Sequence, residues 1–232
     1  MKIKGLQKTT LIDFPGKVAC TIFTAGCNFR CGFCQNPDLI KVDSSLPDLS
    51  EKEFFSFLES RKKWLQGVCI TGGEPTLQKD LPEFCEKIKE LGFEVKLDSN
   101  GSNPLMLKEL IEKNLVDFIA MDIKTSQEKY SDLCETQVDL DKIKESVELI
   151  KNSGLDYEFR STVIPEFFSK EDAVKIGEWL NDSKIFVLQQ FRNNLPMVNP
   201  DYKQKQPFSS EELNELKLLL EPFFDKVEIK NI

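Results

Sequence analysis

Short apolar runs alternate along this chain with longer segments whose apolar residues recur at helical spacing. Six runs are apolar or β-branched and are bounded by polar or turn residues, which is typical of strands. They cover residues 18–23, 68–71, 94–97, 118–123, 157–164 and 185–191. Ser50 followed by Glu53, and Ser209 followed by Glu212, are capping-box patterns that predict the starts of two helices. This alternation predicts an α/β protein with a parallel sheet covered by helices, and it leaves open whether that sheet is a barrel.

Composition limits the class of protein. With 232 residues, 40% of them hydrophobic, the chain can form one domain over residues 1–232. No apolar run approaches the length of a membrane span, and the net charge of −8 opposes nucleic-acid binding. Nothing at the N-terminus resembles a signal peptide, and seven cysteines are an odd number for a secreted disulfide framework. We therefore expect a cytoplasmic protein without a membrane or nucleic-acid partner.

Three cysteines carry the strongest chemical signal. Cys27, Cys31 and Cys34 have C-x3-C-x2-C spacing, so their thiolates can hold three corners of a cubane iron–sulfur cluster. The fourth iron is then open to a ligand that the protein does not supply. A zinc site is the alternative, but the chain contains no His, the commonest partner of Cys in such sites. The other cysteines stand alone in apolar or helical surroundings and read as small core residues: Cys20, Cys69, Cys85 and Cys134.

Further candidate residues follow the predicted strands. Ligands of parallel α/β folds bind beyond the carboxyl ends of the strands, where the loops converge. The cysteine loop follows the first strand, and the next three strands end in Gly72-Gly73-Glu74-Pro75, Asp98-Ser99-Asn100-Gly101 and Asp122-Ile123-Lys124. Glycines let the backbone approach a ligand closely, although a double glycine alone is usually a turn. Asp98 and Asp122 can equally be turn or capping residues.

The cysteine triplet and the run Thr71-Gly72-Gly73-Glu74-Pro75 together resemble the radical S-adenosylmethionine (SAM) enzymes. The aspartate runs at 98–101 and 122–124 are similar to those of the activators of glycyl radical enzymes. The segment Leu6-Gln7-Lys8-Thr9-Thr10-Leu11-Ile12-Asp13-Phe14-Pro15-Gly16-Lys17, with Gln35-Asn36-Pro37 after the cysteines, resembles the activating proteins of anaerobic ribonucleoside-triphosphate reductase. Read alone, Asp13-Phe14-Pro15-Gly16 is an ordinary turn.

This resemblance implies a fold, two cofactors and a set of contacts. The fold is a partial barrel of about six strand–helix units, and the cofactors are one 4Fe–4S cluster on Cys27, Cys31 and Cys34 together with SAM. Glycine carbonyls would accept bonds from the methionine ammonium, and Arg160 would meet its carboxylate or form a structural ion pair. Some related activators carry His near the positions of Gln190 and Arg192, whereas this chain has no His at all. The implied cofactor contacts are Phe33, Gly72, Gly73, Glu74, Asp98, Asn100, Asp122, Lys124, Arg160, Gln190 and Arg192.

The resemblance also implies a reaction. A low-potential donor such as flavodoxin or ferredoxin reduces the cluster, SAM is cleaved to methionine and a 5′-deoxyadenosyl radical, and this radical takes hydrogen from a glycine of a partner enzyme. The partner expected is a glycyl radical enzyme, namely anaerobic ribonucleotide reductase. Two alternatives stay open from the sequence. One is a small radical SAM enzyme that modifies a nucleoside or other metabolite, and the other is a noncatalytic zinc or electron-transfer module.

Overall fold

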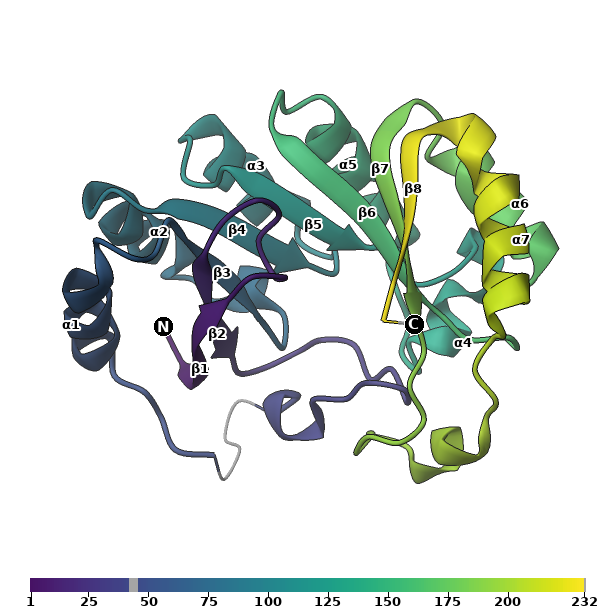
Figure 1. Cartoon of the computed structure of the whole chain (residues 1–232), viewed down its shortest axis with the longest axis horizontal. Helices are drawn as coiled ribbons and strands as arrows, with labels where there is room; N and C mark the ends of the chain where they lie inside the picture. Colours follow the sequence, from purple (N-terminus) through teal and green to yellow (C-terminus); the bar gives the residue numbers. More distant parts are fainter. Residues whose placement is uncertain (42–45, 232) are drawn as a thin grey trace.

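A computed structural model describes residues 1–41 and 46–231 and shows an arched sheet with helices along its outer side (Figure 1). The sheet has eight strands in sequence order, of which β1 is antiparallel to β2 and all later neighbours are parallel. The strands are β1 Ile3–Thr10, β2 Ala19–Thr24, β3 Gly67–Gly72, β4 Glu94–Ser99, β5 Phe118–Asp122, β6 Asp156–Val163, β7 Ser183–Gln190 and β8 Phe224–Lys230. Within the described residues no pairing joins β8 to β1, so the barrel is incomplete.

Helices connect the parallel strands. The α-helices are α1 Glu51–Arg61, α2 Leu81–Glu90, α3 Pro104–Glu112, α4 Tyr130–Leu133, α5 Leu140–Lys151, α6 Lys170–Trp179 and α7 Ser210–Leu220. Short 3-10 turns are η1 Pro37–Leu39, η2 Pro75–Leu77, η3 Gln127–Lys129, η4 Pro200–Gln204 and η5 Glu221–Phe223. Both predicted capping boxes are present, at the starts of α1 and α7. None of the helices in the described part of the chain is long and apolar enough to cross a bilayer.

The predicted α/β fold is confirmed, and the sequence missed two strands. The six predicted strands correspond to β2 to β7, with ends displaced by two residues or fewer, and helices follow each of them to give six strand–helix units. β1 and β8 were missed because they lie at the two edges of the sheet and carry many polar residues, as in IKGLQKTT and FDKVEIK. Edge strands do not need the continuous apolar runs that mark buried strands.

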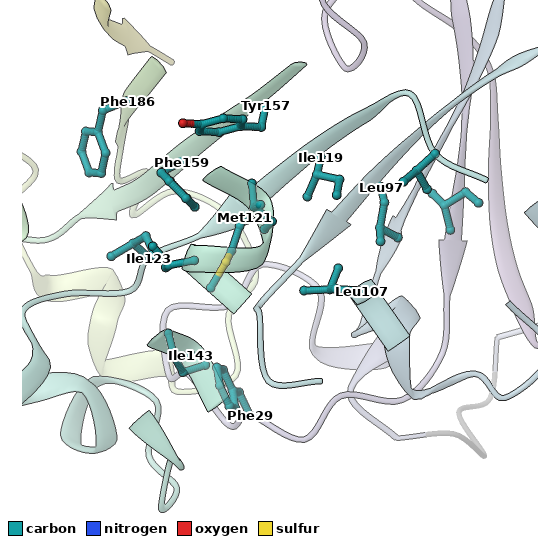
Figure 2. Packing of buried hydrophobic residues seen from close by; sticks show 14 of the residues in the cluster. Phe29, Leu97, Leu107, Ile119, Met121, Ile123, Ile143, Tyr157, Phe159 and Phe186 are labelled. Atoms are coloured by element: carbon teal, nitrogen blue, oxygen red, sulfur yellow. The ribbon is translucent and has the colours of Figure 1, made fainter. Parts of the chain in front are cut away.

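The main core fills the space between the sheet and its helices (Figure 2). Leu97 of β4 and Ile119 and Met121 of β5 point outward, where they pack in one cluster with Leu107 of α3 and Ile143 of α5; all are fully buried. Because side chains alternate along a strand, the residues between these apolar positions face the inside of the arch. Toward the carboxyl ends of the strands the inner face carries charged residues such as Asp98, Asp122 and Arg160.

The Asp-x-Pro-Gly turn closes the amino-terminal end of this inner face. Phe14 is 2% exposed, its ring lies 6.1 Å from that of Phe118, and both belong to a small inner cluster with Ala19 and Ala120. Asp13 accepts a hydrogen bond of 2.5 Å from the Thr21 hydroxyl. Phe14 of this turn therefore closes the amino-terminal end of the barrel, which we call the barrel floor. The turn sequence alone does not indicate this role.

Replacing Phe14 with Ala should destabilise the fold by about 3–5 kcal/mol, because it empties a site that neighbouring strands cannot collapse to fill. Urea unfolding measures this loss. Leu11→Ala is the matched control, since Leu11 lies in the same loop and is 72% exposed. Equal stabilities for the two variants would contradict the assignment of Phe14 as the barrel floor.

Candidate functional site

One pocket of about 410 Å³ lies beyond the carboxyl ends of the parallel strands. Every residue that the sequence suggested for cluster or cofactor lines it: Cys27, Cys31, Phe33, Cys34, Gly72, Gly73, Glu74, Asp98, Asn100, Asp122, Lys124, Arg160, Gln190 and Arg192. The sequence analysis did not select the remaining lining residues, Phe29, Gln35, Asn36, Ile40, Thr71, Ser99, Thr162, Gln189 and Asn231. Most of these residues lie close in the sequence to residues that were selected. For Thr162 and Gln189, the only sequence feature that could have indicated a place in the pocket is their position near the end of a predicted strand.

Hydrogen bonds hold the cysteine loop in place over the pocket. The backbone N–H of Cys27 donates to the Ile40 carbonyl at 3.0 Å, and that of Cys34 donates to the Cys31 carbonyl at 3.0 Å. The Arg30 guanidinium donates to the carbonyls of Cys27 and Phe29 at 2.6 and 2.8 Å. The loop is therefore ordered by the chain itself, and its thiols line the pocket.

Cys134 has a closer relation to the cysteine loop than its sequence suggested. Its carbonyl accepts the backbone N–H of Arg30 at 2.9 Å, and its side chain belongs to the same buried cluster as Cys31. The expectation that Cys134 is a small core residue is confirmed, because its side chain is fully buried in the main hydrophobic cluster, and its backbone in addition anchors the cysteine loop. The signal was absent from the sequence, since about a hundred residues separate the two thiols.

Cys69 lies beside charged groups and not in the apolar surroundings that its sequence indicates. Its sulfur lies 3.8 Å from the Lys96 ammonium and 3.8 Å from an Asp98 oxygen, on the inner face of the sheet. Cys20 and Cys85 are fully buried in the main hydrophobic cluster, as expected. The inner face is polar at this level because the charged residues of β4 alternate with its outward apolar ones.

The glycine pair is required by packing between two loops. The N–H of Gly73 donates to the Thr24 carbonyl at 2.8 Å, and that of Glu74 donates to the Gly26 carbonyl at 2.7 Å. A Cβ on Gly73 would lie 2.2 Å from the Gly26 oxygen, and one on Gly72 would lie 2.4 Å from the Thr24 nitrogen. The sequence interpretation, which gave this space to the ligand, was incomplete: these glycines first let the loop after β3 approach the cysteine loop.

Glu74 and Asn100 join neighbouring loops. Glu74 is 1% exposed and accepts hydrogen bonds from Thr76, the Ser99 hydroxyl and the Asn100 backbone N–H. The Asn100 side chain donates to Asn28 Oδ1 at 3.0 Å. The loop after β3 is thereby fixed to the loop after β4, which in turn holds the cysteine loop.

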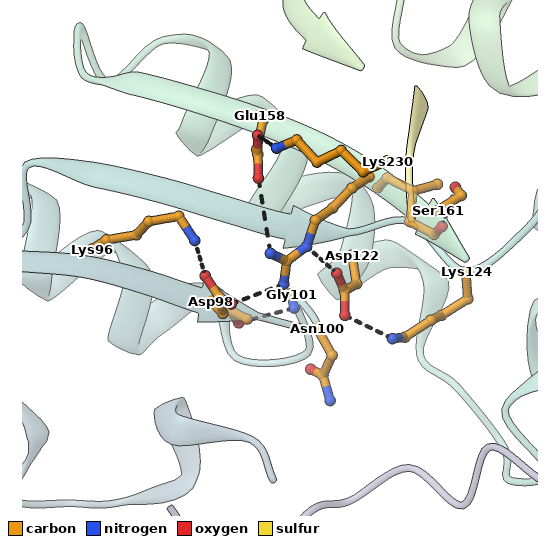
Figure 3. Close-up of polar contacts among 12 residues, drawn as sticks. Lys96, Asp98, Asn100, Gly101, Asp122, Lys124, Glu158, Ser161 and Lys230 are labelled. Atoms are coloured by element: carbon orange, nitrogen blue, oxygen red, sulfur yellow. Dashed lines mark hydrogen bonds and ion pairs between the residues drawn. The ribbon is translucent and has the colours of Figure 1, made fainter. Parts of the chain in front are cut away.

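Arg160 lies among three carboxylates on the inner face (Figure 3). Its Nε donates to Asp122 at 2.7 Å, while the two Nη atoms lie 3.1 Å from Asp98 and 3.8 Å from Glu158. Burial alone would raise the pKa of Asp122, but the charges of Arg160 and Lys124 outweigh it and hold that pKa well below its ordinary value. The guanidinium thus has protein partners on every side.

Three lysines complete this charged network. Lys96, which is 1% exposed, pairs with Asp98, and Lys124 pairs with Asp122 at 2.9 Å. Lys230, at the end of β8, reaches Glu158 at 3.1 Å. Lys230 also lies 3.9 Å from Glu228, so the four cations of the network have four carboxylate partners.

Asp122→Asn should lower stability by on the order of 2 kcal/mol at pH 7, because it weakens a buried ion pair while keeping its shape. The folded-state pKa of Asp122 is depressed, so its carboxylate stabilises the fold above its ordinary pKa of 3.8 and loses this contribution as pH falls below it. The stability difference between wild type and variant should therefore shrink from pH 4 toward pH 2. Unfolding free energies across this range measure it, and a constant difference would contradict the ion-pair account.

Gln190 carries an unmatched polar atom. Its Nε2 donates to the Phe208 carbonyl at 2.5 Å, whereas its Oε1 is buried with no partner within the described residues. Buried acceptors are normally paired, so this atom fits a donor supplied by a ligand of the pocket that Gln190 lines. Arg192 is exposed, and its carbonyl accepts the Gln35 side chain at 3.1 Å.

These groups fit the two cofactors that the sequence implied. The three thiols line one pocket and have the sequence spacing of an iron–sulfur site. Within the described residues, no three Cys, Asp or Glu side chains are gathered closely enough to hold a metal ion, so the fit rests on the donor types and their common pocket. The adjacent wall offers the cations Lys124, Arg160 and Arg192, together with peptide carbonyls and an unpaired amide oxygen. These suit the carboxylate, ammonium and hydroxyl or amine groups of an amino-acid nucleoside.

Comparison with known proteins gives the class. Residues 21–180 match the Radical SAM superfamily, and the chain belongs to it. More particularly, it is a glycyl radical enzyme activating enzyme by family: it is 30% identical over 235 residues to a putative glycyl-radical enzyme activating enzyme of Methanocaldococcus jannaschii, covering 99% of this chain and 96% of that one. It is also 32% identical over 132 residues to the pyruvate formate-lyase-activating enzyme of Listeria monocytogenes, covering 53% of each chain. The family uses a 4Fe–4S cluster and SAM.

Solved structures support the fold. Streptococcus suis SuiB bound to its precursor peptide SuiA has a TM-score of 0.70 at 15% identity, covering 91% of this chain and 48% of that one. A domain of pyruvate-formate lyase-activating enzyme from Bacteroides vulgatus has a TM-score of 0.57 at 17% identity, covering 71% and 99%. The expected partial barrel of the radical SAM kind is thereby confirmed.

Proposed function

We propose that this enzyme generates a glycyl radical on a partner protein, and that the partner is anaerobic ribonucleotide reductase. The observation that carries the proposal is a relative of nearly the same length, with the cluster and cofactor residues gathered in one pocket. The pocket extends from the cysteine loop after β2 to Asn231 beyond β8, so it spans the gap of the incomplete barrel. A glycine-bearing loop of a partner can approach the cofactor through that gap.

When bound, the cluster and SAM supply the reductive cleavage that yields methionine and a 5′-deoxyadenosyl radical able to take hydrogen from a glycine. The protein binds and orients these groups and excludes water. Cys27, Cys31 and Cys34 would hold the cluster, which would bind the methionine end of SAM. No side-chain acid or base is required, which suits a chain without His.

Lys124 is the best-placed cation for the methionine carboxylate. Its ammonium has one carboxylate partner, Asp122, and lies 5.9 Å from the centre of the Phe33 ring in the cysteine loop. Arg160, in contrast, already faces three carboxylates. We therefore assign carboxylate binding to Lys124 and the orientation of Asp98 and Asp122 to Arg160, with Gln190 Oε1 accepting a bond from the adenosine part.

The choice of partner rests on the segment from Leu6 to Lys17 and on Gln35-Asn36-Pro37, which resemble reductase activators. Relatives named for pyruvate formate-lyase make a lyase of that type the competing partner. A flavodoxin or ferredoxin in the reducing cytosol is the proposed electron donor.

Isotope transfer tests the proposal. Each glycyl radical enzyme of the same genome is produced with α-deuterated glycine and mixed anaerobically with the reduced, cluster-loaded protein and SAM. We expect deuterium in 5′-deoxyadenosine only with the ribonucleotide reductase. Deuterium transfer from a lyase instead would identify that lyase, and not the reductase, as the partner. Unlabelled deoxyadenosine with every enzyme would favour a metabolite substrate.

A further inference from the structure

The C-terminal strand takes part in the charged network of the pocket through Lys230. Its ammonium lies 3.1 Å from Glu158 on β6, two strands away in the sheet, and Figure 3 shows the two side chains reaching toward each other. The Glu158 side chain is 4% exposed, so water cannot compensate its charge. Arg160, at 3.8 Å, is its other cationic partner.

Three carboxylates therefore compete for Arg160, and the distances rank them. Asp122 at 2.7 Å and Asp98 at 3.1 Å hold the guanidinium, while Glu158 stands farther away at 3.8 Å. Lys230 is closer to Glu158 than Arg160 is. Because a buried carboxylate is strongly destabilised without a cation, the loss of Lys230 would leave Glu158 to attract Arg160.

We propose that Lys230 is a positioning residue for the cofactor pocket: by neutralising Glu158 it leaves Arg160 bound to Asp98 and Asp122. This inference rests on the proposed function of that pocket as the SAM site. It connects β8, an edge strand, to the residues that meet the cofactor. Arg160 held toward Asp122 also keeps Asp122 in place beside Lys124, which is the cation assigned to the methionine carboxylate.

The test compares the SAM affinity of Lys230→Met with that of the double variant Lys230→Met, Glu158→Gln. If Lys230 only stabilised the fold, removing Glu158 as well would not restore the affinity. Lys230→Met should weaken SAM binding by about tenfold, since networked charges couple by one to a few kcal/mol. Lys230→Met combined with Glu158→Gln should restore affinity to within about threefold of wild type, because the competing charge is gone. Glu158→Gln alone should stay near wild type, since the Lys230 side chain is 34% exposed and reaches water. Lys230→Arg should bind as wild type does.

Calorimetric titration of the cluster-loaded proteins with SAM gives these affinities, with thermal unfolding and iron content measured on each. Lys184→Met is the control, because Lys184 lies on the neighbouring strand β7, is 44% exposed and pairs with Asp156, which is not part of the charged network. It should leave affinity unchanged. Equal affinity of wild type and Lys230→Met, or equal weakness of Lys230→Met and the double variant, overturns this inference alone. Failure of wild type itself to bind SAM overturns both this inference and the proposed function.

Discussion

Gly73→Ala is expected to abolish iron–sulfur loading, although Gly73 contributes no ligand atom. The added methyl carbon would lie 2.2 Å from the Gly26 carbonyl oxygen, a backbone atom at the base of the cysteine loop. The two loops must then separate, which breaks the bonds from Gly73 N–H to Thr24 and from Glu74 N–H to Gly26. Iron content and the visible charge-transfer band after anaerobic reconstitution measure the result, which should fall from about four irons per chain to nearly none.

Gly154→Ala is the control for this change. Gly154 has a left-handed φ of 75°, and a Cβ there would meet nothing within 4 Å. It should cost about 1 kcal/mol of stability and leave iron content intact. Full iron loading with lost SAM binding in Gly73→Ala would show that the glycine serves only the ligand, as the sequence alone suggested.

Cys27→Ala, Cys31→Ala and Cys34→Ala should each remove the cluster and all SAM cleavage, because three thiolates are the minimum set that leaves one iron open. Wild-type protein reconstituted anaerobically should hold about four irons per chain and bleach with dithionite. Iron and sulfide analysis with absorption spectra measures both.

Two other cysteines serve as controls for this series. Cys85→Ala, in the core beside α2, and Cys134→Ala, beside Cys31, should both retain iron. Loss of iron in Cys134→Ala would make it a ligand and remove the open position. Stoichiometric zinc without iron in anaerobically purified wild type would revive the zinc alternative.

The fold was largely predictable because one simple pattern produces it. In β4, charged Lys96 and Asp98 alternate with apolar Val95 and Leu97, and this period of two separates an outer core from a polar inner face. The parallel strands then bring their carboxyl ends together, so motifs far apart in sequence meet in one pocket. The edge strands β1 and β8 carry no such signal, since their burial is partial and their residues are polar.

The sequence predicted which residues would meet in one pocket, but it did not predict the contacts among them. Motif position placed Asp122, Lys124 and Arg160 in the pocket, but it could not show that Arg160 is saturated by three carboxylates. The contact of Asn28 with Asn100 spans 72 residues, and Lys230 reaches Glu158 across the same separation of 72. Such pairings depend on the curvature of the whole sheet, which local patterns do not encode.

Electron paramagnetic resonance can show whether this chain makes a glycyl radical on another protein, as we propose. Reduced, cluster-loaded protein is mixed anaerobically with SAM and the anaerobic ribonucleotide reductase of its own organism. We expect a glycine-centred doublet that requires SAM and disappears when Cys31→Ala replaces the wild type. Formation of 5′-deoxyadenosine without such a doublet, with this reductase and with every other glycyl radical enzyme of that organism, would contradict this proposal.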